Sequence, residues 1–506
     1  MDNSAKMSSA ALSAAAEGPA VSLAHLQSGR GIAALKGVFW SSINTLVPAI
    51  LGLAVFVVSS RFLTPTDFGL VGLAASIGMF ASAIAPGAFA EALIQRSKLT
   101  NDHVDTVFWL CAASGLALFC LLLVFSSPIA SLVGQPSIAL LIQVFALRFL
   151  FDLLACVPNA LIARSMLFNL IALRTTIAST IAAVCCFALL YLGYGLWALV
   201  VSQVAASFIS FVVAFWAAKH IPAFRFDLPS LKEVASYGIF ASGTRFVGTM
   251  KLDQILLGSL AGPAVLGIYN FARRLLTILN SVMAGTLASV SHSLFSSLQE
   301  SQAKVREAFL LATFASLTVS FPVFAGLALI SNELIPLVFG EKWLSAIVPV
   351  QALCAVGLIA SIGIVQSSLI ASQGKTNWWF YYQAVQQGIT LGIILAFHSY
   401  GVEVLTIAIA IKTYLLWPIS FLMSAVLVNV SVWKYLQQMV PAAVSVFAMV
   451  IVLIVTRDSL SAFDPYFRLA LQVFLGGTVY VSLVSILSFH RIKHLVQVFQ
   501  SRRKQH

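Results

Sequence analysis

Long, uninterrupted apolar runs limit most strongly what this chain can fold into. A helix that crosses the hydrocarbon core of a bilayer needs about 20 mostly apolar residues, and fourteen segments of the chain meet that requirement. The runs are continuous and do not alternate, which excludes a transmembrane β-barrel. The predicted spans are 38–60, 69–94, 104–127, 137–161, 170–191, 195–218, 236–260, 264–290, 308–330, 346–371, 377–397, 402–428, 435–456 and 467–489.

The composition agrees with this interpretation. Of 506 residues, 60% are hydrophobic and 9% are charged, whereas soluble domains average roughly 25% charged residues. A large soluble enzyme, a coiled coil and a disordered protein are therefore excluded. We expect an all-α polytopic membrane protein with about 14 transmembrane helices and short loops. Such loops leave no room for a soluble catalytic domain, and we expect neither an enzyme, a cofactor nor a metal site.

The basic residues predict the orientation of the helices. The chain has 29 Lys and Arg against 17 Asp and Glu. If the N-terminus is cytoplasmic, most loop cations fall on the cytoplasmic side, as is typical of inner-membrane proteins. The outside loops then contain only Arg61, Lys342, Arg457 and Arg468. Both termini are predicted to be cytoplasmic.

Two similar loops indicate an internal repeat. Pro65 and Gly69 follow the first predicted helix, and Pro263 and Gly267 follow the seventh with the same spacing. Because six helices separate the two loops, both copies run in the same direction, as in transporters built from two parallel lobes. The predicted organisation is a disordered cytoplasmic N-terminal tail (1–37), an N-lobe (38–218), a cytoplasmic linker (219–235), a C-lobe (236–428), helices 13 and 14 (429–490) and a basic cytoplasmic tail (491–506).

More cations than acids fall inside the predicted spans. An unpaired charge near the bilayer centre costs about 2.5–3.5 kcal/mol on insertion scales, so such residues tend to pair or to line a wet cavity. The excess of positive charge favours an anionic substrate. The cations are Arg148, Arg174, Arg245, Lys251, Arg273, Arg274 and Lys412, and the acids are Glu91, Asp152 and Asp253.

The individual residues allow different roles. Arg148 and Asp152 are spaced i, i+4 and share one helix face, so either a structural salt bridge or a cavity role is possible. Arg174 lies near a helix end and can reach the interface. Lys412 lies in mid-span without an acid nearby in the sequence, which favours a functional role.

Both lobes contain distinctive sequence motifs. In the first lobe they are RFLTPTDFGL (61–70), ALIQR (92–96) and TVFW (106–109), and in the second lobe LDQILLG (252–258) and LGIY (266–269). These motifs resemble those of Wzx-type polysaccharide flippases. These flippases belong to the multidrug/oligosaccharidyl-lipid/polysaccharide exporter superfamily. The resemblance implies two parallel six-helix lobes around a central cavity, with two C-terminal helices added.

The resemblance also implies a cargo. It is an undecaprenyl-pyrophosphate-linked oligosaccharide, moved across the bacterial inner membrane for exopolysaccharide or lipopolysaccharide synthesis. A proton or sodium gradient drives some members, and a polysaccharide polymerase with chain-length and export machinery is the expected partner. Nucleic acid is not expected as a partner.

From depth and charge, we assign the candidate residues as follows. The pyrophosphate candidates are Arg148, Arg245, Lys251 and Lys412, the secondary candidates are Arg273 and Arg274, and the ion-coupling candidates are Asp253, Glu91 and Asp152. The alternative functions are a peptidoglycan lipid-precursor flippase and a cation-coupled multidrug exporter of the same superfamily.

Overall fold

The computed structural model describes residues 30–96, 99–235, 238, 242, 251–297 and 301–489, and within them it is helical without strands. The long helices and their bounds are α2 (Arg30–Phe62), α3 (Pro65–Ile84), α4 (Phe89–Gln95), α5 (Asn101–Leu132), α6 (Ala139–Leu154), α7 (Cys156–Arg164), α8 (Phe168–Tyr191), α9 (Trp197–Ala218), α11 (Leu252–Leu260), α12 (Pro263–Ser297), α13 (Gln302–Leu334), α14 (Ile347–Ser372), α15 (Thr376–Phe397), α16 (Gly401–Val428), α17 (Val432–Thr456) and α18 (Pro465–Leu487). Short helices η2 (Pro86–Ala88), η4 (Ile335–Phe339) and η5 (Glu341–Ala346) connect some of them.

The helices confirm a multi-span membrane protein. Among the described residues, eleven segments are long and apolar enough to cross a bilayer. One of these segments, Thr376–Val428, comprises both α15 and α16. Helix α12 is as long as the others but contains Arg273 and Arg274, which lower its hydropathy. Of the predicted span 236–260, α11 covers the last part, and most of the rest lies outside the described residues.

Three boundaries differ from those predicted from the sequence. The predicted span 69–94 is broken at Pro86, because proline lacks an amide hydrogen and disrupts a continuing helix; α3 ends at Ile84 and α4 follows. The span predicted at 137–161 is divided at Ala155 into α6 and α7. Helix α2 begins at Arg30, inside the predicted tail, where alanine and leucine favour helix formation. Residues 1–29 and 490–506 lie outside the described residues.

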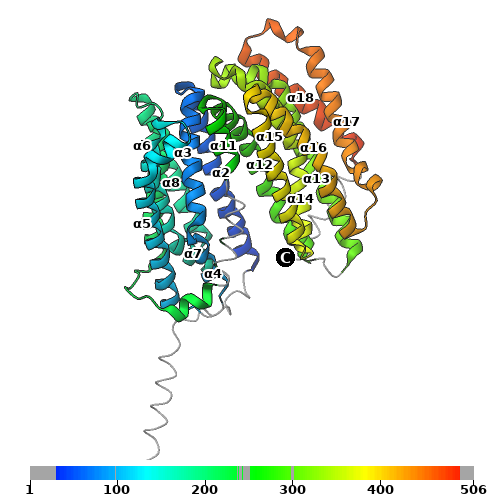
Figure 1. The fold of residues 1–506 in the computed structure, drawn as a ribbon. Helices are drawn as coiled ribbons and strands as arrows, with labels where there is room; N and C mark the ends of the chain where they lie inside the picture. Colours follow the sequence, from blue (N-terminus) through cyan, green and yellow to red (C-terminus); the bar gives the residue numbers. More distant parts are fainter. Residues whose placement is uncertain are drawn as a thin grey trace, which may run out of the picture.

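The helices form two lobes with the same internal packing (Figure 1). In the first lobe α2 packs on α8, α5 on α6, and α9 on both α6 and α8. In the second lobe α11 packs on α15, α13 on α14, and α16 on both α14 and α15. This correspondence supports the repeat predicted from the two Pro-x-x-x-Gly loops. Helices α17 and α18 pack against α13, on the outer side of the second lobe.

The lobes meet at one end, here called the Arg61 end, and their ribbons diverge toward the end that carries α4 and α7 (Figure 1). At the Arg61 end, Arg61 donates hydrogen bonds to the carbonyls of Leu337 and Val338 in the opposite lobe. Trp343 is fully buried there, and its indole Nε1 donates to the carbonyl of Ser60 at 3.0 Å. The Arg61 end is therefore closed by contacts between the lobes.

The two repeated glycines allow a close backbone contact between the lobes. Helices α3 and α12 both begin with proline, at Pro65 and Pro263, which suits the first turn of a helix. A Cβ atom on Gly69 would overlap the carbonyl oxygen of Pro263, and one on Gly267 would overlap the carbonyl oxygen of Pro65. The contact is reciprocal, because the glycine of each repeat motif packs against the proline backbone of the other motif.

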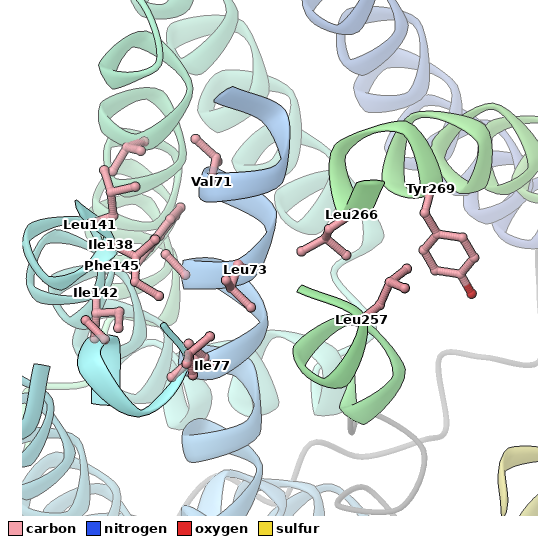
Figure 2. Packing of buried hydrophobic residues seen from close by; sticks show 14 of the residues in the cluster. Val71, Leu73, Ile77, Ile138, Leu141, Ile142, Phe145, Leu257, Leu266 and Tyr269 are labelled. Carbon is pink, nitrogen blue, oxygen red and sulfur yellow. The ribbon is translucent and has the colours of Figure 1, made fainter. Parts of the chain in front are cut away.

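Apolar packing continues from this contact into both lobes (Figure 2). Leu73 of α3 is fully buried and lies beside Leu257 of α11 and Leu266 of α12. On the other side of α3, Phe145 of α6 packs in the same cluster. Helix α3 is thus held between its own lobe and the opposite one.

The predicted linker 219–235 is attached to the first lobe. Trp109 of α5 donates to the carbonyl of Ala223 at 2.8 Å, and its ring stacks on Phe224 with centroids 4.4 Å apart. His220 Nε2 lies 2.9 Å from the buried carboxylate of Asp105. These contacts fix the linker to the N-terminal part of α5, so it is expected to move with this lobe.

Replacing Gly69 by Ala tests the close approach of the lobes. The added methyl group would overpack a backbone contact, at an expected cost of about 1–3 kcal/mol. We therefore expect the melting temperature of the purified protein in detergent to fall. The control is Gly477→Ala in α18, where an added Cβ meets open space. A G69A protein that melts no lower than the G477A protein would contradict this packing.

Candidate functional site

A cavity of about 470 Å³ lies between the lobes, and we call it the cationic cavity. Helices α2, α3, α6 and α9 of the first lobe line one side. Helices α11 and α12, with Lys251 just before α11, line the other. None of the described lining residues is acidic. Its polar lining residues include Arg148, Gln203, Lys251, Gln254, Asn270, Arg273 and Arg274.

A second cavity of about 430 Å³ lies within the second lobe, and we call it the α15 cavity. Its walls come mainly from α14, α15 and α16, with Asp253 of α11 and Tyr269 and Arg273 of α12 at one side. Because Arg273 lines both cavities, they are neighbours that share this side chain.

Together the two cavities have a strong excess of positive charge. Their described linings include five cations, and Asp253 is the single acid among them. Asp253 is itself occupied, since its carboxylate forms an ion pair with Arg273 and accepts a hydrogen bond from Tyr269 Oη at 3.3 Å. The remaining cations are Arg148, Lys251, Arg274 and Lys412.

Arg148 combines the two roles that its sequence spacing left open. Its Nη1 donates to Gln203 Oε1 at 2.5 Å, which directs the guanidinium along the cavity wall. Its Nε lies 3.7 Å from Asp152 Oδ2, an ion pair whose carboxylate is half exposed. The i, i+4 pair therefore exists, and Arg148 lines the cationic cavity as well.

Lys412 is the most enclosed cation of the site, with 8% of its surface exposed. Its Nζ donates to Thr390 Oγ1 at 3.0 Å and to the side-chain and backbone oxygens of Gln386 at 3.4 and 3.5 Å. In the described part of the chain no carboxylate lies within ion-pair distance of this ammonium. It lines the α15 cavity and not the cationic cavity with which Arg148 and Lys251 are associated.

Other candidates lie elsewhere. Glu91 was predicted inside a span, but the break at Pro86 places it on α4, exposed and outside both cavities. Asp152 lines two smaller pockets near α6. Arg174 donates to the side-chain oxygen of Asn159 and lines neither large cavity. Arg245 lies outside the described residues.

The sequence analysis missed the polar face of α15. Trp379, Tyr382, Gln383, Gln386, Gln387 and Thr390 all line the α15 cavity from this one helix. Their spacing of three and four residues is the signature of a helix face, and polar residues on that pattern inside an apolar span were the available signal. These side chains are neutral, so an excess of charge within a span does not reveal them.

The fold and the site define a class of protein: a two-lobed, multi-span membrane protein with a cationic cavity between its lobes. The chain belongs to the family of polysaccharide biosynthesis proteins, whose family model matches residues 58–348, more than half of its length. This confirms the relationship inferred from the motifs around Pro65 and Asp253.

Individual relatives agree with the family. The chain is 28% identical over 465 residues to the teichuronic acid biosynthesis protein TuaB of Bacillus subtilis, covering 89% of this chain and 95% of TuaB. It is 24% identical over 386 residues to the lipopolysaccharide biosynthesis protein WzxC of Escherichia coli, covering 71% and 78% of the two chains. Its fold resembles that of the lipid II flippase MurJ in an inward closed conformation, with a TM-score of 0.75, 17% identity and coverage of 89% and 99%.

Replacing Asp253 by Asn tests whether this carboxylate holds Arg273 in place. Removing one partner of a largely buried pair leaves the other charge uncompensated, at a cost of about 3 kcal/mol or more. We expect the melting temperature to fall clearly, and to recover in part in the D253N/R273Q double variant. The matched control is Asp152→Asn, because Asp152 is half exposed. Equal melting temperatures for D253N and D152N would rule out a structural role for the Asp253 pair.

Proposed function

We propose that this protein flips an undecaprenyl-pyrophosphate-linked oligosaccharide across the bacterial inner membrane, for exopolysaccharide or lipopolysaccharide synthesis. The observation that carries the proposal is the cationic cavity between the lobes of a member of the polysaccharide biosynthesis family. The relatives TuaB and WzxC are named for the biosynthesis of teichuronic acid and of lipopolysaccharide, both of which contain sugars.

A pyrophosphate is the chemical group that fits the cationic cavity. It carries several negative charges, and guanidinium groups bind phosphate oxygens through paired, charge-assisted hydrogen bonds. Arg148, Lys251 and Arg274 line this cavity, and the described residues that line it include no acid. We assign the pyrophosphate to these three residues, with Arg273 at the boundary of the second cavity. Arg245 stays a candidate from the sequence.

Alternating access explains how the head group crosses. The distribution of loop cations supports cytoplasmic termini, which makes the Arg61 end periplasmic and the diverging end cytoplasmic. In this arrangement the lobes receive cargo from the cytoplasm. Rocking of the two lobes about their contact would transfer the polar head group, while the prenyl chain stays in lipid. A polysaccharide polymerase and export machinery would take over the product, so the role is transport without a catalysed reaction.

The positive charge of the cavity lining separates this function from that of a multidrug exporter. A cation-coupled multidrug exporter for cationic compounds would need an acidic cavity, and the described lining here has the opposite charge. A flippase for the peptidoglycan lipid precursor would also bind an anionic head group with cations, and the fold resembles that of MurJ. The sequence relatives and the family model favour the polysaccharide cargo.

Charge-removing variants test the pyrophosphate site. We expect Arg148→Gln, Lys251→Gln and Arg274→Gln each to slow transport about tenfold or more, since each removes a charged hydrogen-bond donor. The conservative Arg274→Lys variant should retain part of the activity, because lysine keeps the charge but loses the fork. The measurement is the appearance of lipid-linked repeat units on the periplasmic face in a deletion strain that carries each variant.

Lys434→Gln provides the control, because Lys434 is an exposed cation on α17 outside both cavities. Protein levels are compared on immunoblots. Wild-type transport by all three cavity variants at normal protein levels would refute the assignment.

An ion gradient is the expected source of energy, with Asp253 and Asp152 as candidate coupling residues. Collapsing the proton or the sodium gradient in proteoliposomes should then reduce uphill transport of the lipid-linked oligosaccharide. The Asp253→Asn variant should lose this dependence if Asp253 carries the ion. Transport that is indifferent to both gradients would exclude ion coupling.

A further inference from the structure

The α15 cavity differs in chemistry from the cationic cavity beside it. Beside aliphatic side chains, its lining includes aromatic rings and neutral amides, among them Trp379, Tyr382, Trp417, Gln366, Gln383 and Gln386. Rings of this kind offer flat apolar faces, and glutamine offers a hydrogen-bond donor and an acceptor on one group. This combination is poorly suited to a pyrophosphate.

Sugars have the complementary chemistry. One face of a sugar ring presents C–H groups, which pack on an aromatic ring, and its edge presents hydroxyl groups, which both donate and accept hydrogen bonds. In the α15 cavity the rings of Trp379 and Tyr382 lie next to each other, with centroids 5.3 Å apart. Gln386 is held in place between them and Lys412, since its Nε2 donates to Tyr382 Oη at 2.6 Å.

Two lining groups lack partners of their own. Within the described part of the chain, the indole Nε1 of Trp417 and the Oε1 of Gln366 are buried and make no hydrogen bond. Buried polar atoms are nearly always paired in folded proteins, so each unpaired atom calls for an explanation. Neither atom is exposed to the cavity in this conformation, so a hydroxyl group of a bound sugar would meet them only if Trp417 and Gln366 turn toward the cavity.

The charge of Lys412 adds a requirement. Its ammonium is buried among neutral oxygens of Gln386 and Thr390, and burial of a cation without an opposite charge is costly. The nearest acid in the lining, Asp253, is already paired with Arg273. An anionic group on the ligand would supply the missing charge.

We propose that the α15 cavity is a subsite for the sugar part of the cargo, in which Trp379 and Trp417 contact the sugar rings and Lys412 pairs with a carboxylate on an acidic sugar. This inference rests on the proposed function, and it divides the cargo between two neighbouring cavities. The pyrophosphate occupies the cationic cavity, and Arg273 lies at the boundary between the two parts. A volume of about 430 Å³ lies within the range of ligand pockets, about 300–1,000 Å³.

Binding of two ligands to the purified protein separates the subsites. One ligand is undecaprenyl pyrophosphate, which has no sugar, and the other is the lipid-linked oligosaccharide extracted from the deletion strain. We expect Trp379→Ala and Lys412→Gln to weaken binding of the oligosaccharide about tenfold and to leave binding of undecaprenyl pyrophosphate unchanged. Arg274→Gln should weaken both. The matched controls are Trp379→Phe, which keeps a ring, and Trp378→Ala, which removes the adjacent tryptophan outside the cavity.

The carboxylate is tested with the same oligosaccharide after chemical reduction of its carboxyl groups to alcohols. The wild-type protein should bind the reduced form about tenfold more weakly, and Lys412→Gln should bind both forms equally. Equal binding of both forms by the wild type, or an extracted cargo without acidic sugars, would overturn the role of Lys412.

The outcomes distinguish a failure of the sugar subsite from a failure of the proposed function. If Trp379→Ala keeps its affinity for the oligosaccharide, or loses affinity for both ligands to the same extent, the sugar subsite is wrong while the proposed function stands. If the wild-type protein binds neither ligand, the proposed function itself fails, and the inference fails with it. Melting temperatures of all variants show whether a loss of binding reflects unfolding.

Discussion

The arrangement of this protein depends on how closely α3 and α12 approach each other. Gly69 lies against the backbone of Pro263, and Gly267 lies against the backbone of Pro65. In a membrane, where lipid tails are as apolar as the side chains, helices associate through close packing and small residues. This reciprocal contact brings the lobes together at the Arg61 end, where the aromatic rings around Trp343 fill the space between them. Farther along α12, Arg273 and Arg274 then face the first lobe across the cationic cavity.

Both cavities are lined by charged side chains, whose exposure to the hydrocarbon core of the bilayer would be costly in free energy. Arg148 and Arg274 come from different lobes and line the same cavity. Asp253 forms an ion pair with Arg273, and Arg148 forms one with the half-exposed Asp152. No acid other than Asp253 is among the described residues that line the two cavities. The chemistry of the site therefore changes along its length, from guanidinium and ammonium groups near α6 to amides and indoles on α15 and α16.

The sequence predicted the helices well because each span satisfies its own backbone hydrogen bonds and needs a fixed apolar length. The boundary errors arose where a single residue interrupts an apolar run. Pro86 breaks the span predicted at 69–94, and this break places Glu91 on the short helix α4, away from both cavities. The repeat was predictable too. In each copy a proline begins the helix, and a glycine four residues later allows close approach of the other lobe's backbone, so the spacing is visible in the sequence.

By itself, the sequence determined that this chain is a two-lobed membrane protein with excess positive charge inside its spans, and its motifs indicated the family. These conclusions follow from apolar length, charge counts and local spacing, which need no knowledge of neighbours. The tertiary structure alone decided which charges meet. Lys412 lies some 140 positions from Arg273 in the sequence, and only the packing of α16 beside α12 shows that they line the same cavity. The structure also shows that the polar face of α15 lines that cavity. The sequence alone does not show this, because the packing of neighbouring helices decides which face of a helix is buried and which lines a cavity.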